Sequence, residues 1–76
     1  MELVEKIRAG QLPPPYVRES IRRTAGASYA EMGAAMTPPV TGVTVWRWEQ
    51  GKAVPRRDHA IAYRQLLDAL RELVAS

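Results

Sequence analysis

Residues 28–57, SYAEMGAAMTPPVTGVTVWRWEQGKAVPRR, decide the fold of this chain. Ser28 is followed three positions later by Glu31, which is the spacing of a capping box, and each side chain can accept a hydrogen bond from the other residue's backbone N–H. This signal predicts a helix that runs to about Met36. Residues 38–39 are both proline and must end the helix, because proline lacks an N–H and its ring clashes with the preceding turn.

A second short helix is predicted directly after this turn. Thr41 is a suitable N-cap, residues 42–50 form the helix, and Gly51 supplies the left-handed residue that ends many helices. Val45 and Trp48 lie three residues apart and are expected to point inward. The opposite side, which is expected to face outward, carries Gly42, Val43, Trp46 and Arg47.

The first of these helices contains Gly33 near its middle, where glycine costs about 1 kcal/mol relative to alanine. Close approach of the second helix would explain this glycine, because a residue without a Cβ lets two backbones come near each other. Two short helices joined by a turn and followed by a basic loop, residues 52–57, have the outline of a DNA-reading helix-turn-helix.

The rest of the chain is predicted from the same kinds of signal. Residues 2–9 form a short amphipathic helix, residues 16–25 form another that Pro15 could begin, and residues 58–74 form the longest. The apolar stripe of this last helix comprises Ile61, Leu66, Leu67, Leu70, Leu73 and Val74. We therefore expect an all-α fold, a compact bundle of four to five helices. Its single domain, residues 1–76, comprises a leading helix (1–11), a proline-rich linker (12–15), a helix-turn-helix core (16–57) and a C-terminal helix (58–76).

Composition restricts the function. The chain has 76 residues, no cysteine and one histidine, His59, so it offers neither a disulfide nor a zinc site. It shows no nucleophile–base pair and no glycine-rich phosphate loop after a strand, so we expect no enzyme activity, metal, cofactor or small-molecule substrate. No segment approaches the ~20 apolar residues of a membrane span, and the N-terminus lacks an apolar signal core. We expect a cytoplasmic protein without membrane contact.

The charges are unevenly placed. The net charge is +3, and the excess lies in residues 12–58, which hold seven bases and four acids. Such a basic middle is typical of a face that binds a polyanion. Arginine-rich composition from a GC-rich gene is the competing explanation. The bases are Arg18, Arg22, Arg23, Arg47, Lys52, Arg56 and Arg57, and the acids are Glu19, Glu31, Glu49 and Asp58.

Residues 17–57 resemble the lambda-repressor-like helix-turn-helix domain, also called the XRE family. The segment GASYAEMG, residues 26–33, resembles the family's GLSQxELA opening. The segment VTGVTVWRWEQGKAVP, residues 40–55, resembles its VSxxTISRWENGxxxP segment. The second similarity is the more specific one, and the residues in register are Arg47, Trp48, Glu49, Gly51, Lys52 and Pro55.

The resemblance implies a role for each matching position. Thr41 would contact a phosphate and cap the reading helix, whereas Gly42, Val43 and Arg47 would face bases. Tyr29, Gln50 and Lys52 would contact the DNA backbone, and Arg22 would pair with Glu49 inside the domain. The candidate DNA-binding residues are Tyr29, Thr41, Gly42, Val43, Thr44, Trp46, Arg47, Gln50, Lys52, Arg56 and Arg57. The candidate structural residues are Arg22, Gly33, Trp48 and Glu49.

Three features depart from the family pattern. The turn of residues 36–40 is two residues longer than usual, Gly42 and Val43 lack hydrogen-bonding side chains, and Tyr29 replaces the usual glutamine. A weaker and more shape-dependent DNA binder would be consistent with all three.

The implied function is sequence-specific binding of double-stranded DNA by a repressor-like transcriptional regulator of bacterial or phage type. Residues 42–50 would read the major groove. An excisionase-type architectural binder is one alternative, since VTVWRW followed by Gly51 also resembles the reading helix of those winged domains. A protein-interaction module that lost DNA binding is another, because Gly42, Val43 and Trp46 make an apolar face. The C-terminal helix could also pair two subunits through Leu70, Leu73 and Val74.

Overall fold

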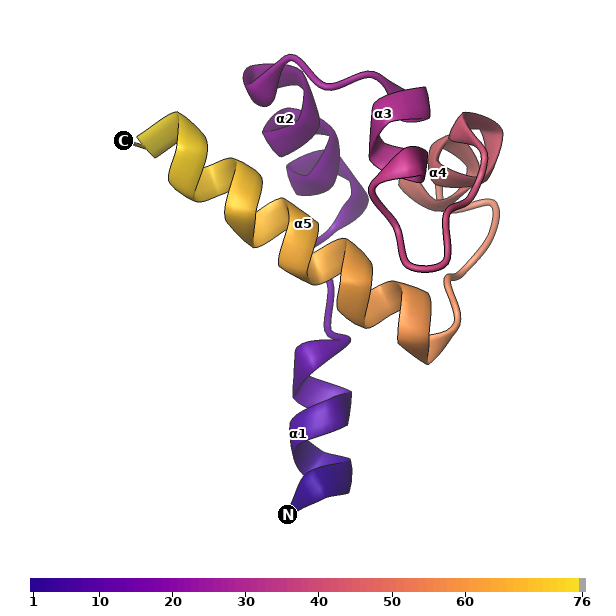
Figure 1. The fold of residues 1–76 in the computed structure, drawn as a ribbon, viewed down its shortest axis with the longest axis vertical. Helices are drawn as coiled ribbons and strands as arrows, with labels where there is room; N and C mark the ends of the chain where they lie inside the picture. The colour runs from indigo at the N-terminus through magenta and orange to yellow at the C-terminus, as the bar shows by residue number, and fades with distance from the viewer. Residues whose placement is uncertain (76) are drawn as a thin grey trace.

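The computed structural model describes residues 1–75, which form five α-helices and no strand (Figure 1). In chain order these helices are α1 (Glu2–Ala9), α2 (Pro15–Ala25), α3 (Tyr29–Ala34), α4 (Gly42–Glu49) and α5 (Arg57–Ala75). The radius of gyration is 11.8 Å, close to the value of about 11 Å expected for a compact chain of this length. The predictions of an all-α fold and of four to five helices are confirmed. Within residues 1–75, no helix combines the length and the apolar character needed to cross a membrane.

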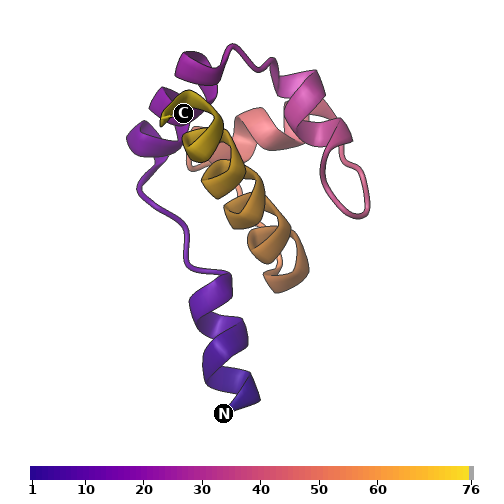
Figure 2. The same cartoon turned by 60° about the vertical axis from the view of Figure 1, so that its left-hand side comes forward.

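The longest helix, α5, packs against α1 and α2, while α4 packs against α2 and α3. In both views α1 projects away from the other helices (Figures 1 and 2). Its apolar side chains Leu3, Val4 and Ile7 are exposed. Arg64 of α5 donates a hydrogen bond to the carbonyl of Arg8 at the end of α1. The leading helix therefore forms as predicted but contributes no buried residue to the core.

The predicted caps are present. Ser28 Oγ accepts from the backbone N–H of Glu31 at 3.0 Å, and Glu31 Oε1 accepts from the N–H of Ser28 at 2.9 Å. Thr41 Oγ1 caps α4 by accepting from the N–H of the residue three positions on, at 3.2 Å. Gly26 and Gly51 end α2 and α4 with φ of +74° and +73°.

Several helix boundaries differ from prediction by one or two residues; for example, α4 ends at Glu49 instead of Gln50. α3 ends at Ala34 instead of near Met36, because the carbonyl of Gly33 accepts from the N–H of Met36 and, at 3.0 Å, from that of Val40. These bonds turn the chain out of the helix before the prolines are reached. α5 begins at Arg57, one residue earlier than expected.

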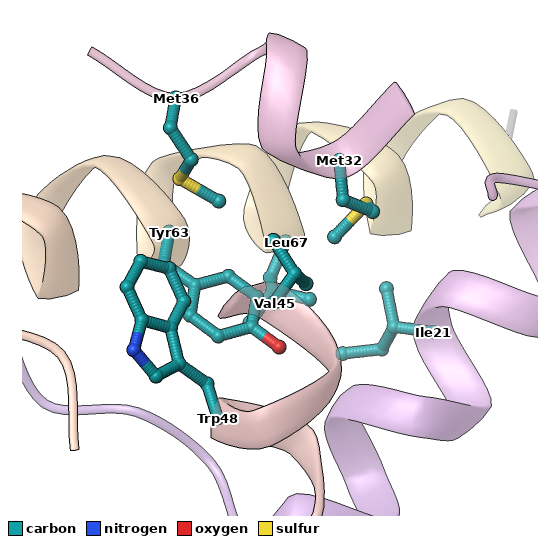
Figure 3. Close-up of a cluster of buried hydrophobic side chains, with 7 residues drawn as sticks. All are labelled: Ile21, Met32, Met36, Val45, Trp48, Tyr63 and Leu67. Carbon is teal, nitrogen blue, oxygen red and sulfur yellow. The ribbon is translucent and has the colours of Figure 1, made fainter. Parts of the chain in front are cut away.

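The core lies between α5 and the helices α2, α3 and α4 (Figure 3). Val45 and Trp48 are buried as predicted, and Met32 and Met36 are buried with them. Tyr63 was not predicted to be buried, yet it is fully enclosed, and its ring centroid lies 5.6 Å from that of Trp48. The complete set of clustered buried side chains is Ile21, Met32, Met36, Val45, Trp48, Tyr63 and Leu67.

The apolar stripe predicted for the last helix is only partly used by the core. Leu67 is buried, and Leu66 and Leu70 pack against the cluster from its edge. Leu73 and Val74 are exposed. The expectation that these two residues could pair subunits stays a prediction.

Two glycines let α3 and α4 come together. A Cβ at position 33 would lie 2.3 Å from the carbonyl oxygen of Val40 and 3.0 Å from the carbonyl carbon of Thr41. The missing Cβ of Gly33 therefore leaves room for the backbone that precedes α4. Close approach of α4 itself had been expected at this glycine. A Cβ on Gly42 would lie 2.9 Å from the backbone nitrogen of Ala30. The first residue of α4 and the two residues before it therefore lie directly against the backbone of α3.

We predict that Gly33→Ala lowers the free energy of unfolding by about 1–3 kcal/mol, because the added methyl group overpacks a filled site. Urea denaturation followed by circular dichroism measures this change. Gly10→Ala is the matched control, since a Cβ there meets its nearest neighbours at 3.5 and 3.6 Å and φ is −93°. Equal stability of the two variants would contradict the assigned backbone contact.

The hydroxyl of Tyr63 is buried without a hydrogen-bond partner among the described residues. Burial raises the pKa of Tyr63 from 10.0 to about 12, because an ionised phenolate is poorly solvated there. The folded protein therefore holds this proton more tightly than the unfolded chain. The resulting stabilisation is complete below pH 10.0 and is lost as the pH rises towards about 12.

We predict that Tyr63→Phe is neutral or stabilising at neutral pH, because it removes an unsatisfied buried group that costs about 1–3 kcal/mol. Its stability should also decline less steeply than that of the wild type between pH 10 and 12. Some alkaline loss should persist, since the pKa of Tyr29 is raised as well. Urea midpoints across this pH range test both effects. A destabilised Tyr63→Phe variant would show that the hydroxyl has a stabilising partner.

Candidate nucleic-acid interface

The two sides of α4 differ in character. Val43, Arg47 and Gln50 follow one another at helical spacing and are exposed. Trp46 flanks them and is partly exposed. The side facing the interior carries Val45, Trp48 and Glu49, which are buried. We call the set Val43, Trp46, Arg47 and Gln50 the outward face.

Gly42 does not belong to this face, contrary to the prediction. The position of a Cβ on Gly42 points at α3, 2.9 Å from the backbone nitrogen of Ala30 and 3.1 Å from the carbonyl carbon of Tyr29. Gly42 lies seven residues before Glu49, two turns along the helix, and so shares the inward side with it. The glycine therefore serves helix packing and cannot present a group to a base.

Tyr29 is also turned inward, so its expected contact with a DNA backbone is corrected. Its hydroxyl donates to Glu49 Oε1 at 2.7 Å, and its ring lies 4.0 Å from the guanidinium carbon of Arg22. Desolvation raises the pKa of Tyr29, and the hydrogen bond to Glu49 raises it further. A phenol has one proton to donate, and the Tyr29 hydroxyl donates it to Glu49 inside the domain.

Arg22 and Glu49 form the internal ion pair that the resemblance implied. Arg22 Nε lies 2.8 Å from Glu49 Oε2, and Arg22 Nη2 lies 3.0 Å from Oε1. Burial alone would raise the pKa of Glu49, but hydrogen bonds from Arg22 and Tyr29 outweigh it and hold that pKa below its usual range. A further hydrogen bond, from Arg22 Nη1 to the carbonyl of Ala27 at 3.2 Å, ties the same guanidinium to the chain before α3.

Arg18, counted among the bases of a polyanion-binding face, is buried instead. Its Nη2 donates to the carbonyl of Trp48 at 3.1 Å, and its guanidinium carbon lies 5.6 Å from the centre of the Tyr63 ring. A cation at this place satisfies the C-terminal end of α4. Arg18 lies one turn before Arg22 on the same side of α2. Its spacing of four residues from Arg22, which was expected to lie inside the domain, was the sequence signal that could have predicted the burial of Arg18.

Half of the exposed lysine and arginine side chains lie in residues 32–57. This range contains four bases and one acid, Glu49, which is buried and paired. The four bases, Arg47, Lys52, Arg56 and Arg57, are all exposed. The surface of residues 32–57 therefore carries cations and no exposed carboxylate. The predicted basic surface is thus narrower than the sequence suggested, since Arg18 and Arg22 do not contribute to it.

Lys52 lies beside the outward face. Its Nζ is 4.7 Å from the centre of the Trp46 ring, a cation–π distance, and Trp46 keeps 37% of its surface exposed. Thr41 is exposed at the other end of α4, where its hydroxyl oxygen lies 3.0 Å from that of the half-buried Thr44. These contacts fix the two ends of the outward face.

The longer turn between α3 and α4 is anchored at two points. The side chain of Met36 is buried in the core. The Nε2 atom of His59, in the first turn of α5, lies 3.0 Å from the carbonyl oxygen of Pro38. The His59 ring also lies 5.6 Å from that of Trp48. The turn therefore packs against α5 without displacing α4 from α3 (Figure 1).

Comparison with known proteins finds no match for this chain, neither among family models nor among curated proteins or solved structures. The family resemblance of residues 26–55 therefore stays a hypothesis. Within residues 1–75, no three His, Asp or Glu side chains are arranged to hold a metal ion.

We predict that Glu49→Gln lowers the free energy of unfolding at neutral pH by about 3 kcal/mol, because it leaves the buried Arg22 without a counter-charge. Since the folded-state pKa of Glu49 is depressed below 4.5, its contribution is present above pH 4.5 and is lost as the pH falls through the folded-state pKa. The variant should therefore lose less stability on acidification than the wild type does.

Glu31→Gln is the matched control for this measurement. Glu31 is exposed, and hydrogen bonds with Ser28 lower its pKa too, but its removal strands no buried cation. Urea midpoints at neutral and acidic pH compare the variants. If Glu49→Gln and Glu31→Gln unfolded at the same urea concentration, the buried pair would not stabilise the fold.

Proposed function

We propose that this chain binds double-stranded DNA as a lambda-repressor-like helix-turn-helix protein. In this proposal α3 and α4 are the helix pair and α4 lies in the major groove. The biological role would be repressor-like regulation of transcription, of bacterial or phage type. The observation that carries the proposal is the surface of residues 32–57, which exposes four cations, including Arg47 on the outward face and Lys52 beside it, and buries its single carboxylate.

Some residues would position the DNA through its phosphates, and others would recognise its bases. Thr41 and the N-terminal end of α4 suit a phosphate, because unpaired backbone N–H groups and the helix dipole favour an anion there. Lys52, Arg56 and Arg57 would contact phosphates without regard to sequence. Arg47, on the outward face, is the side chain suited to bidentate pairing with guanine O6 and N7. Gln50, on the same face, would contact the DNA backbone.

A protein-interaction module is the second candidate, favoured by the exposed apolar side chains Val43 and Trp46. Such residues also mark protein interfaces when they gather on a surface. An excisionase-type protein has less support, because the segment after α4 is the helix α5 and residues 1–75 contain no strand that could form a wing.

We predict that Arg47→Ala weakens binding to the preferred duplex about tenfold or more and relaxes the preference for guanine at one position. Lys52→Ala should weaken binding to all sequences alike and reduce the salt slope by about 1. Fluorescence anisotropy, first with random-sequence duplexes and then with a selected site, measures both effects across a salt titration.

Arg71→Ala is the matched control for this experiment. Arg71 is an exposed arginine near the C-terminal end of α5, outside residues 32–57, and its loss should leave affinity and salt slope unchanged. If the wild type bound no duplex at low salt, the DNA proposal would be wrong. A partner protein whose binding depended on Trp46 would then support the interaction module.

A further inference from the structure

The outward face exposes two apolar side chains that the fold does not use. Val43 is 60% exposed and belongs neither to the core cluster nor to its partly buried edge. Valine is also a poorer helix former than lysine or glutamine, because its branched Cβ restricts the side chain in a helix. Neither packing nor helix propensity therefore accounts for valine at position 43.

Trp46, three residues further along α4, is held in place. The ammonium group of Lys52 lies 4.7 Å from the centre of its ring. This contact lies at the edge of the outward face, while more than a third of the residue stays open. The face thus presents an apolar surface beside Arg47, and the cations Arg47 and Lys52 favour a polyanion over a protein partner.

The floor of the major groove offers one apolar group, the C5 methyl of thymine. Val43 precedes Arg47 by four residues, which is about 6 Å along the helix axis. Base pairs follow one another every ~3.4 Å. Along a helix that follows the groove, a methyl group against Val43 therefore lies about two base pairs from a guanine paired with Arg47.

We infer that Val43 and Trp46 are specificity-determining residues that recognise thymine methyl groups within about two base pairs of the guanine contacted by Arg47. This inference rests on the proposed function and names the kind of sequence that the same site reads. Since Gly42 packs against α3, the recognition depends on these two apolar side chains and Arg47.

The experiment replaces each thymine of the selected site, one at a time, with deoxyuracil. This change removes one methyl group and leaves base pairing and charge intact. Anisotropy at fixed salt should show a loss of affinity of about fourfold at two positions, the value expected for one buried methyl group at each. At one of these positions Val43→Ala should bind the thymine and uracil forms with equal affinity. At the other position Trp46→Ala should do so.

Val54→Ala is the matched control, because Val54 is 89% exposed and lies outside the outward face. It should retain the full preference for thymine. Val43→Ala replaces an exposed valine by a better helix former, so loss of the fold does not obscure its result. Circular dichroism tests whether Trp46→Ala also keeps the fold.

The outcomes separate this inference from the proposed function. Absence of DNA binding at low salt would refute both. Equal affinity for every thymine and uracil form of the preferred site would overturn the inference and leave the proposed function standing. Salt-dependent binding with no preferred site would overturn the inference and also the reading role proposed for Arg47. A thymine preference that survives in both Val43→Ala and Trp46→Ala would also overturn it.

Discussion

The carboxylate of Glu49 joins three helices of this domain. It accepts two hydrogen bonds from Arg22 of α2 and one from Tyr29 of α3, while it belongs to the last turn of α4. A buried charge is tolerated only when it is paired and its hydrogen-bonding capacity is met. The rotation of α4 about its own axis is therefore restricted by this one side chain. With Glu49 directed inward, the opposite side of α4 must face solvent.

The close contact between α3 and α4 supports the same arrangement. Gly33 and Gly42 remove the side chains that would separate the two backbones. The longer turn between the helices does not disturb this contact, because Met36 enters the core and His59 of α5 meets the carbonyl of Pro38. Extra chain length is thus accommodated against α5, where it leaves the outward face of α4 open.

The arginine side chains of this small protein lie in two distinct environments, buried and exposed. Arg18 and Arg22 lie inside, where a carbonyl and a carboxylate accept their hydrogen bonds. Arg47 and Arg56 lie outside, where residues 32–57 offer no exposed carboxylate to neutralise them. The arginines inside position α4, and those outside give its surroundings their charge. Counting charges along the sequence could not separate the two groups, since burial depends on which acceptors the fold brings near.

The sequence by itself determined the local features. The caps at Ser28 and Thr41, the helix ends at Gly26 and Gly51, and the inward positions of Val45 and Trp48 follow from interactions or periodicity within a few residues. Only the tertiary structure decided which way the other side chains turn. Sequence reasoning misplaced or missed Arg18, Tyr29, Gly42 and Tyr63. Each of these contacts a helix that lies elsewhere along the chain, and such partners are set by packing, which no local pattern encodes.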